Sequence, residues 1–212
     1  FSLESGQTAD CRIDWERRFD NMQRHCGEHI LSGMFFREYG GVNRGFHMGD
    51  DYMTIDISLE EKPEFTELTM DMCLKVERFA NEAVWANLPV ITRRFENRED
   101  AEKLPLRKRP TVTEHVRIVA MGDFEMVACG GTHPATAGQI GLVKILSVAP
   151  ARGKMRVTFL AGQRALADYT CVHDAAHQAA AMLSTGVENL PAAVAAMQEK
   201  LRNAEFELLQ MK

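Results

Sequence analysis

The chain has no long uninterrupted hydrophobic run among its 212 residues. A membrane-spanning helix needs about 20 consecutive apolar residues, so we expect no membrane association through such a helix. The start of the chain also lacks the basic and then apolar segments of a secretory signal. The chain begins at Phe1 rather than at a methionine, and we therefore interpret it as a piece of a longer polypeptide.

Cysteine is scarce, and positive charge is not in excess. The five cysteines are odd in number and widely spaced, which argues against a disulfide framework and favours the reducing cytoplasm. The formal net charge of −5 excludes a protein coated in basic surface, but it does not exclude a local basic patch. An apolar fraction of 45% and a charged fraction of 26% are ordinary for a globular protein with a real core.

The spacing of apolar residues predicts two helices in the first half of the chain. One covers residues 15–39 with Asp14 as its N-cap, and the other covers residues 63–87 with Pro63 in its first turn. Strand-type runs between glycines and prolines cover residues 42–58, 90–92, 112–121, 125–129, 138–147 and 154–160. This order predicts an α+β fold, in which helices pack on one face of an antiparallel sheet.

Residues 166–212 differ in character from residues 1–165 and predict a helical extension. An Ala-rich helix is expected over residues 168–182, and a second helix begins near Pro191. The apolar residues of the second helix alternate spacings of four and three, which is typical of a coiled-coil seam. They are Leu190, Val194, Met197, Leu201, Ala204, Leu208 and Met211. This seam favours a homodimer through the helix, and packing of the helix on the preceding domain is the alternative.

Two pairs of metal-ligand residues stand about a hundred positions apart. His25 and His29 lie four residues apart on the first predicted helix, so both imidazoles face the same side. Such a pair alone is weak, because core and surface histidines often have this spacing. Cys129 and His133 flank a Gly-Gly-Thr turn, where glycines allow a thiolate and an imidazole to converge. Together the four side chains predict a tetrahedral zinc site.

The first helix also carries a competing motif. Residues 25–29 match H-x-x-E-H, the inverzincin pattern, in which Glu28 would be the general base of a metallopeptidase. Such a site takes a further acidic ligand and does not need the pair formed by Cys129 and His133. The peptidase is therefore the less favoured alternative.

The two pairs resemble the metal ligands of the editing domain of alanyl-tRNA synthetases and of the free-standing AlaX-type editing proteins. Threonyl-tRNA synthetase shares the domain more distantly. The resemblance runs in order over residues 8–165. The similar stretches outside the ligands are Arg12-Ile13-Asp14-Trp15-Glu16-Arg17-Arg18, Gly45-Phe46-His47-Met48-Gly49, Thr54-Ile55-Asp56, Met121-Gly122-Asp123-Phe124 and Gly138-Gln139-Ile140-Gly141.

The resemblance implies a zinc-dependent hydrolase that acts on tRNA. Family members cleave the ester between a wrong amino acid, serine or glycine, and the alanine-accepting tRNA. An alanine site cannot exclude glycine by size and excludes an added hydroxyl poorly, so a second site must edit. The resemblance further implies that residues 1–165 form the editing domain and that residues 166–212 are the family's coiled-coil-like connector, cut short.

The resemblance implies the ligands but leaves the chemistry open. A bound zinc can polarise the ester or activate water, yet both roles need an open coordination position, which four protein ligands do not leave. In that case the backbone N–H groups of Gly130 and Gly131 are candidate oxyanion donors, with Thr132 beside them in the substrate pocket.

Three further residues are candidates for the pocket. Cys26 stands where many family members have Thr, so it either faces the substrate or fills the core. Glu28, where many relatives have Gln, is a candidate base, a support for a ligand histidine, or a surface carboxylate. His47, on the strand after the first helix, is a second catalytic candidate or a structural histidine.

The strongest basic stretch runs over residues 103–110. Arg107, Lys108 and Arg109 are expected to contact tRNA phosphates, and a merely solvated loop is the alternative. Two other functions stay open beside the hydrolase. One is a non-catalytic module that binds zinc and tRNA. The other is an editing fragment of a complete alanyl-tRNA synthetase, which the AlaX-like residues 12–18 and 45–49 disfavour.

Overall fold

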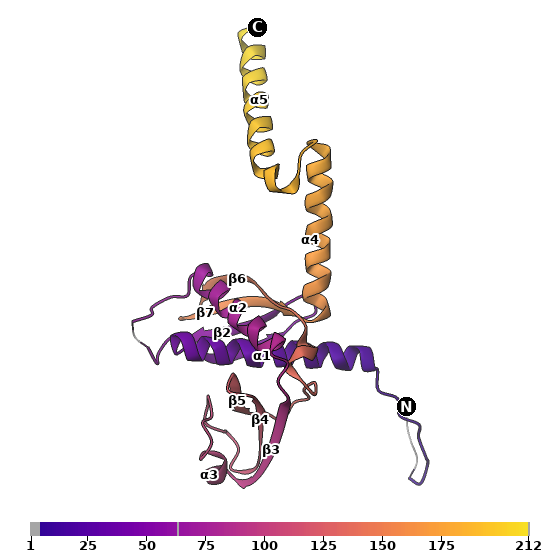
Figure 1. The fold of residues 1–212 in the computed structure, drawn as a ribbon, viewed down its shortest axis with the longest axis vertical. Coiled ribbons are helices and arrows are strands. Elements are labelled where there is room, and N and C mark those ends of the chain that lie inside the picture. Colours follow the sequence, from indigo (N-terminus) through magenta and orange to yellow (C-terminus); the bar gives the residue numbers. More distant parts are fainter. Residues whose placement is uncertain (1–4, 63, 212) are drawn as a thin grey trace. The chain divides into compact units, whose positions relative to one another are not determined.

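The computed structural model describes residues 5–62 and 64–211 (Figure 1). The chain divides into two compact units, one up to Ala165 and one from Leu166. The first unit contains two antiparallel sheets with helices packed against them, and the second is helical. The predicted α+β class is confirmed, although the strands form two sheets rather than one. No helix among the described residues is long and apolar enough to cross a membrane.

The larger sheet has four antiparallel strands in the order β1-β2-β7-β6. Their bounds are Val42–Met48 for β1, Met53–Ser58 for β2, Val143–Ala151 for β6 and Lys154–Ala161 for β7. The helices α1 (Trp15–Tyr39) and α2 (Met70–Trp85) pack on this sheet, and all three share one hydrophobic core. The largest fully buried side chains of the described chain are Phe35, Phe159, Ile30, Leu31, Met34, Met53, Ile55, Ile57, Ile118, Met121, Ile140 and Ile145.

The smaller sheet has three strands in the order β3-β4-β5. Their bounds are Val90–Asn97 for β3, Glu114–Met121 for β4 and Glu125–Ala128 for β5. The strand predicted over residues 90–92 was too short, because β3 pairs with β4 through to Asn97 and is followed by the helical turn α3 (Arg98–Ala101). The charges of β3 are compatible with pairing because their side chains are exposed.

Other element boundaries also differ from the prediction. The α2 helix begins at Met70 because Thr69 caps it, accepting a hydrogen bond from Met72 N at 3.3 Å. Pro63, the expected helix start, lies outside the described residues. The strand predicted over residues 138–147 begins only at Val143, because the 3₁₀ turn η1 (Ala137–Ile140) occupies its first part.

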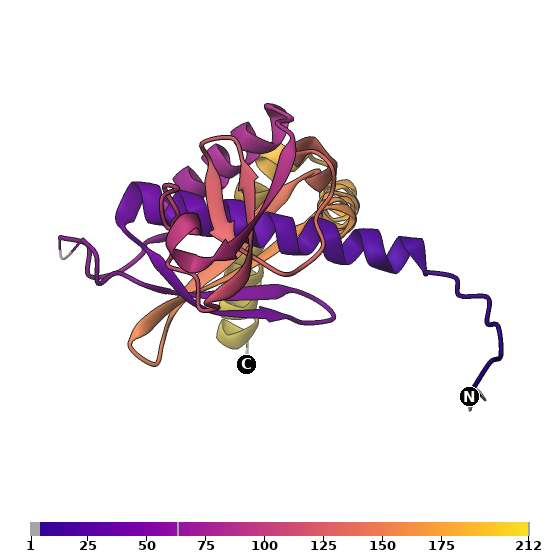
Figure 2. The same cartoon turned by 90° about the horizontal axis from the view of Figure 1, so that it is seen from below.

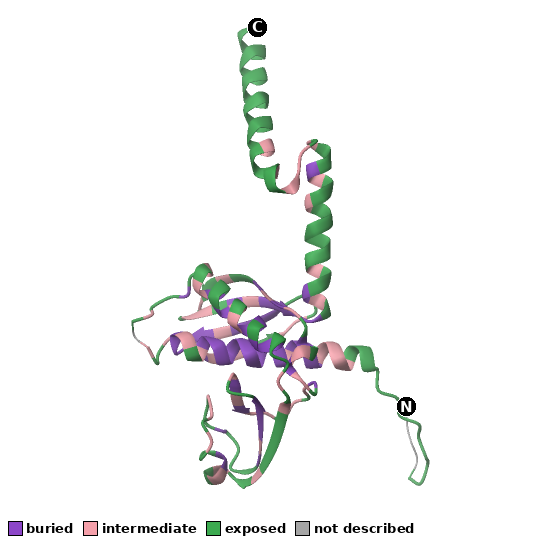
Figure 3. Ribbon diagram, viewed as in Figure 1, coloured by how far each residue is buried: buried purple, intermediate pink, exposed green. Residues whose placement is uncertain are grey.

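The α1 helix lies between the two sheets of the first unit (Figures 1 and 2). Asp14 caps its start by accepting from Arg17 N, as predicted, and Gly40 ends it with a φ of 62°. Its middle turns are buried around the helix (Figure 3). Each sheet packs closely against α1 at a glycine of the helix. A Cβ at Gly27 would lie 2.8 Å from Ala161 Cβ, and one at Gly33 would lie 2.5 Å from Glu125 Oε2.

The helix α4 (Gln163–Met182) begins in the first unit and continues into the second. The second unit also contains the short 3₁₀ helix η2 (Val187–Asn189) and the helix α5 (Leu190–Gln210). Several residues of the predicted seam are more than half exposed, including Met197, Leu201 and Leu208. The pairing of this helix with a second copy stays a prediction.

Replacing the fully buried Ile55 of β2 with Ala should lower the free energy of unfolding by about 2–5 kcal/mol, because the lost methyl groups leave a cavity. The same change at Ile91, which is 45% exposed on β3, should cost less than about 1 kcal/mol. Urea unfolding measures both variants, and equal losses would contradict the described core.

Candidate metal centre

The four residues of the predicted zinc site converge in the structure. His25 and His29 lie one turn apart on α1, Cys129 directly follows β5, and His133 lies in the loop before η1. Their potential ligand atoms all lie within 4.8 Å of one another. The described residues of this cluster include no carboxylate, and Glu28 is not part of it. The acidic ligand that a peptidase of the H-x-x-E-H type requires is therefore not present in this cluster.

Three of the spacings between the potential ligand atoms match the edges of a tetrahedral zinc site. The Nε2 atoms of His25 and His29 lie 3.2 Å apart, and those of His29 and His133 lie 3.4 Å apart. Cys129 Sγ lies 3.6 Å from His25 Nε2. Zinc bonds of about 2.0–2.1 Å to nitrogen and 2.3 Å to sulfur give tetrahedral edges of about 3.3 Å and 3.6 Å. The Cys-His₃ set therefore fits zinc in donor chemistry and in size.

Cys129 and His133 hold the protonation states that bind a metal, whereas burial of His29 is outweighed by contacts with Cys129 and Glu125 that raise its pKa to about 10, so this imidazole must lose a proton when a metal binds. Burial would raise the pKa of Cys129, but contacts with His133, His25 and His29 outweigh it and lower that pKa to about 3. The thiol is therefore a thiolate at neutral pH, the form that binds zinc. Burial is the main reason that the pKa of His133 lies below its ordinary value, which keeps this imidazole neutral.

The Nδ1 atom of each histidine on α1 lies near an oxygen atom of another segment. His25 Nδ1 lies 3.4 Å from the carbonyl oxygen of Thr132. His29 Nδ1 lies 3.7 Å from Glu125 Oε1, beyond hydrogen-bond reach, and has no hydrogen-bond partner among the described residues. The Glu125 side chain is fully buried and accepts hydrogen bonds from Arg107 at 2.8 and 2.9 Å. Carboxylate–histidine contacts of this kind orient metal ligands in many proteins.

The turn that carries Cys129 is shaped around the cluster. Gly131 N donates to Cys129 Sγ at 3.3 Å, and a Cβ on Gly131 would lie 2.8 Å from His25 Nδ1. Arg117 of β4 donates to the carbonyl oxygens of Cys129 at 2.7 Å and Gly131 at 2.8 Å. The sequence did not indicate Arg117, because an arginine within a strand-type run carries no signal of what it faces.

A cleft of about 320 Å³ lies beside the cluster. It is lined by Glu28, His29, Asn43, Arg44, Gly45, Phe46, Arg107, Lys108, Val127 and Ala128. Glu28 is buried, and its Oε1 accepts hydrogen bonds from Ser32 Oγ at 2.6 Å and Asn43 Nδ2 at 2.7 Å. The Phe46 ring stacks on His25 with a centroid distance of 6.3 Å. The cleft has the size of a small-ligand pocket.

Of the predicted pocket residues only Glu28 lines the cleft. Gly130, Gly131 and Thr132 belong to the Cys129 turn outside its lining, and Cys26 and His47 lie elsewhere. Cys26 is fully buried in the core with Sγ 3.3 Å from Met121 Sδ, and burial raises its pKa to about 12. It therefore fills the core instead of facing the cleft. His47 is exposed on β1 and neither joins the cluster nor lines the cleft. Successive side chains of a strand point to opposite faces, and it is the neighbouring Phe46 that turns toward His25.

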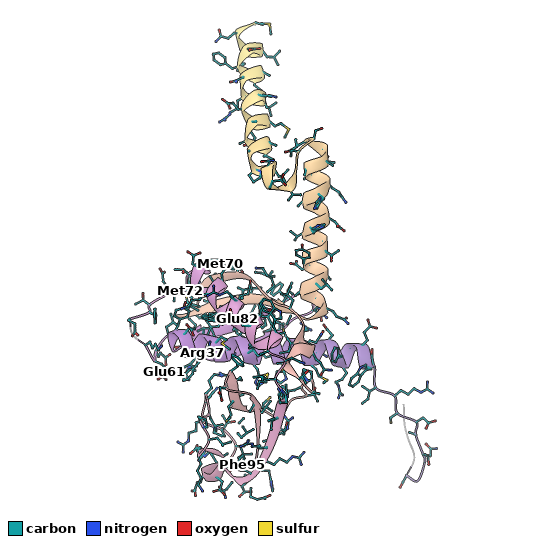
Figure 4. All side chains as sticks on the ribbon, in the orientation of Figure 1. Arg37, Glu61, Met70, Met72, Glu82 and Phe95 are labelled. Carbon is teal, nitrogen blue, oxygen red and sulfur yellow. The ribbon has the colours of Figure 1, made fainter. Side chains whose placement is uncertain are left out.

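The three basic residues of the segment before β4 have different environments. Arg107 is nearly buried, with 9% of its side chain exposed, and Glu125 raises its pKa against the effect of burial. Arg109 is exposed and pairs with Glu102 at 2.6 Å. Lys108 is exposed and lines the cleft. In Figure 4 the labelled Arg37 lies on α1 and the labelled Phe95 lies on β3 of the three-stranded sheet.

Comparison with known proteins identifies relatives over most of the chain. Residues 116–158, which include Cys129 and His133, match the family model of the threonyl and alanyl tRNA synthetase second additional domain. The alanyl-tRNA editing protein AlaX-L of Pyrococcus horikoshii is 32% identical over 165 residues, covering 77% of this chain and 39% of the relative. The chain is homologous to AlaX-type alanyl-tRNA editing proteins. The resemblance found in the sequence is thereby confirmed.

Other relatives include both alanyl-tRNA editing proteins and alanine–tRNA ligases. The mouse alanyl-tRNA editing protein Aarsd1 is 28% identical over 206 residues, covering 95% of this chain and 47% of the relative. The alanine–tRNA ligase of Pyrococcus furiosus is 28% identical over 195 residues, covering 89% of this chain and 21% of the ligase. The chain thus spans less than half of the length of these relatives.

Replacing Gly131 with Ala should weaken metal binding, because the new Cβ would collide with the His25 ring. Gly130 is the matched control, since a Cβ there would meet nothing within 4 Å. Isothermal titration with Zn²⁺ should show a weaker affinity for Gly131→Ala and an unchanged affinity for Gly130→Ala. A Gly131→Ala variant that binds as tightly as the parent would refute the described packing of His25.

Proposed function

We propose that this chain hydrolyses the ester of mischarged alanine-accepting tRNA in trans, removing serine or glycine, with zinc bound by His25, His29, Cys129 and His133. The observation that carries the proposal is the Cys-His₃ cluster of tetrahedral size beside a small cleft. The homologous editing proteins support the substrate class. All five cysteines are free, and a thiolate ligand needs reducing conditions, which supports a cytoplasmic location.

The proposed role of the metal follows from the number of its ligands. A zinc ion with an open position polarises an ester carbonyl or activates water, whereas a site closed by four protein ligands is structural. Four protein side chains supply the ligand atoms, and three of the spacings between them match tetrahedral edges. We therefore assign the ion the task of ordering α1 and the Cys129 turn around the cleft.

Glu28 is the proposed general base. Both of its hydrogen-bond donors, Ser32 and Asn43, use Oε1, so Oε2 can accept a proton from water. The water oxygen then bonds to the ester carbon, and the ribose hydroxyl of the tRNA leaves with a proton returned by Glu28. His47 has no part in this step, because it is exposed and outside the cleft.

Gly130 is the better of the two proposed oxyanion donors. The Gly131 N–H already donates to Cys129 Sγ. In this mechanism the Gly130 N–H stabilises the negative charge that develops on the ester oxygen. Thr132 is exposed on the same turn, outside the cleft lining, and stays a proposed substrate contact.

The test of this function is deacylation of seryl-, glycyl- and alanyl-tRNA by the zinc-loaded chain, with and without a chelator. Seryl- or glycyl-tRNA should be hydrolysed faster than alanyl-tRNA, and the chelator should abolish the reaction. Glu28→Gln should keep its zinc and lose about 10²- to 10⁴-fold in kcat. Binding of zinc and tRNA without hydrolysis of any substrate would instead identify a non-catalytic module.

Lys108 is the proposed tRNA contact nearest the cleft. Lys108→Glu should weaken tRNA binding and lower the slope of log affinity against log salt by about 1, because one phosphate contact is lost. Lys103→Glu is a control with the same charge change, since Lys103 is exposed and pairs with Asp100. Filter binding over a range of salt concentrations measures both, and equal effects would point to a general charge effect.

A further inference from the structure

We propose that Arg107 is a positioning residue of the metal centre, which holds Glu125 so that Glu125 orients His29. This inference rests on the metal site of the proposed function, and it replaces the phosphate contact expected of Arg107. The chain of contacts runs from the basic segment through β5 to α1. No part of it requires RNA.

The first link is the ion pair between Arg107 and Glu125. Arg107 Nε lies 2.9 Å from both carboxylate oxygens, and its Nη2 lies 2.8 Å from Oε1. The exposed fraction of the side chain is 9% for Arg107 and zero for Glu125. A guanidinium with this little exposure cannot reach a phosphate without breaking the pair. A fork of several hydrogen bonds fixes the direction of a carboxylate, which a single-point contact does not.

The second link joins Glu125 to His29. Glu125 Oε1 lies 3.7 Å from Nδ1, on the side of the imidazole opposite the Nε2 that faces the cluster. His29 is 4% exposed, and Nδ1 has no hydrogen-bond partner among the described residues. His25 has the Thr132 carbonyl behind its ring instead. Glu125 is therefore the acceptor available to fix the His29 ring, and a small movement closes the distance when the metal binds.

The surroundings keep this chain of contacts in place. Gly33 lies one turn after His29 on α1, and its missing side chain leaves the space that the Glu125 carboxylate occupies. The backbone of Arg107 donates to Met126 O at 2.9 Å, which ties the basic segment to β5. Buried ion pairs seldom add much stability compared with apolar residues, so stability alone does not explain such an arrangement.

Zinc affinity measures the proposed role directly. Arg107→Met should weaken zinc binding about 10- to 100-fold, as loss of a support behind a ligand histidine does. Arg107→Lys keeps the charge without the fork of hydrogen bonds. Its zinc affinity should therefore lie between those of Arg107→Met and the parent. Arg109→Met removes an arginine that is exposed and pairs with Glu102, and it should leave the affinity within about two-fold. Competition with a chromophoric chelator gives the constants.

A double-mutant cycle tests whether Arg107 acts through Glu125. Glu125→Gln alone should weaken zinc binding, and adding Arg107→Met to it should cause little further loss. The absorption bands of bound Co²⁺ report the ligand geometry, and they should change in both single variants but not in Arg109→Met. Additive losses in the cycle would overturn the proposal.

The remaining outcomes separate this inference from the proposed function. Circular dichroism checks folding, and if Arg107→Met does not fold, the comparison of Arg107→Lys with Arg109→Met decides. If Arg107→Met leaves zinc affinity unchanged and reduces the salt dependence of tRNA binding, Arg107 contacts RNA instead. That result would overturn this inference alone. Failure of the parent chain to bind zinc would overturn the metal centre and this inference together.

Discussion

The close approach of α1 to β5 and to the turn that follows it is the constraint on which the site depends. A side chain at Gly33 would collide with Glu125, and a side chain at Gly131 would collide with His25. Because both approaches are this tight, the ligands of two distant segments reach one point. The larger sheet and α2 matter to the site mainly by fixing the position of the same helix.

The parts of the fold that the sequence revealed are those with local signals. Asp14 caps α1 as expected, and the helix ends where expected at Gly40, since a cap and a left-handed glycine act within a few residues. The division of the strands into two sheets was not predictable in the same way, because it depends on long-range pairing such as that of β2 with β7. The full length of β3 was missed because charged exposed strands carry no alternating apolar pattern.

The candidate site shows the same division between local and long-range information. The four candidate ligands could be predicted because their spacing and chemistry are recognisable in sequence, and the structure brings them together. The residues that surround the candidate ligands could not be predicted, because nothing local marks Glu125 or Arg117 as neighbours of the cluster. Cys26 and His47 show the limit of placing pocket residues by sequence position, because each side chain faces away from the cleft.

The ligands come from segments about a hundred residues apart, His29 on α1 and Cys129 after β5. An ion bound by both would cross-link the chain as a disulfide does, closing a long loop and removing conformations from the unfolded state. Folding and metal loading would then be one linked equilibrium. Metal supply during synthesis would then add to the stability of the fold before any substrate is met.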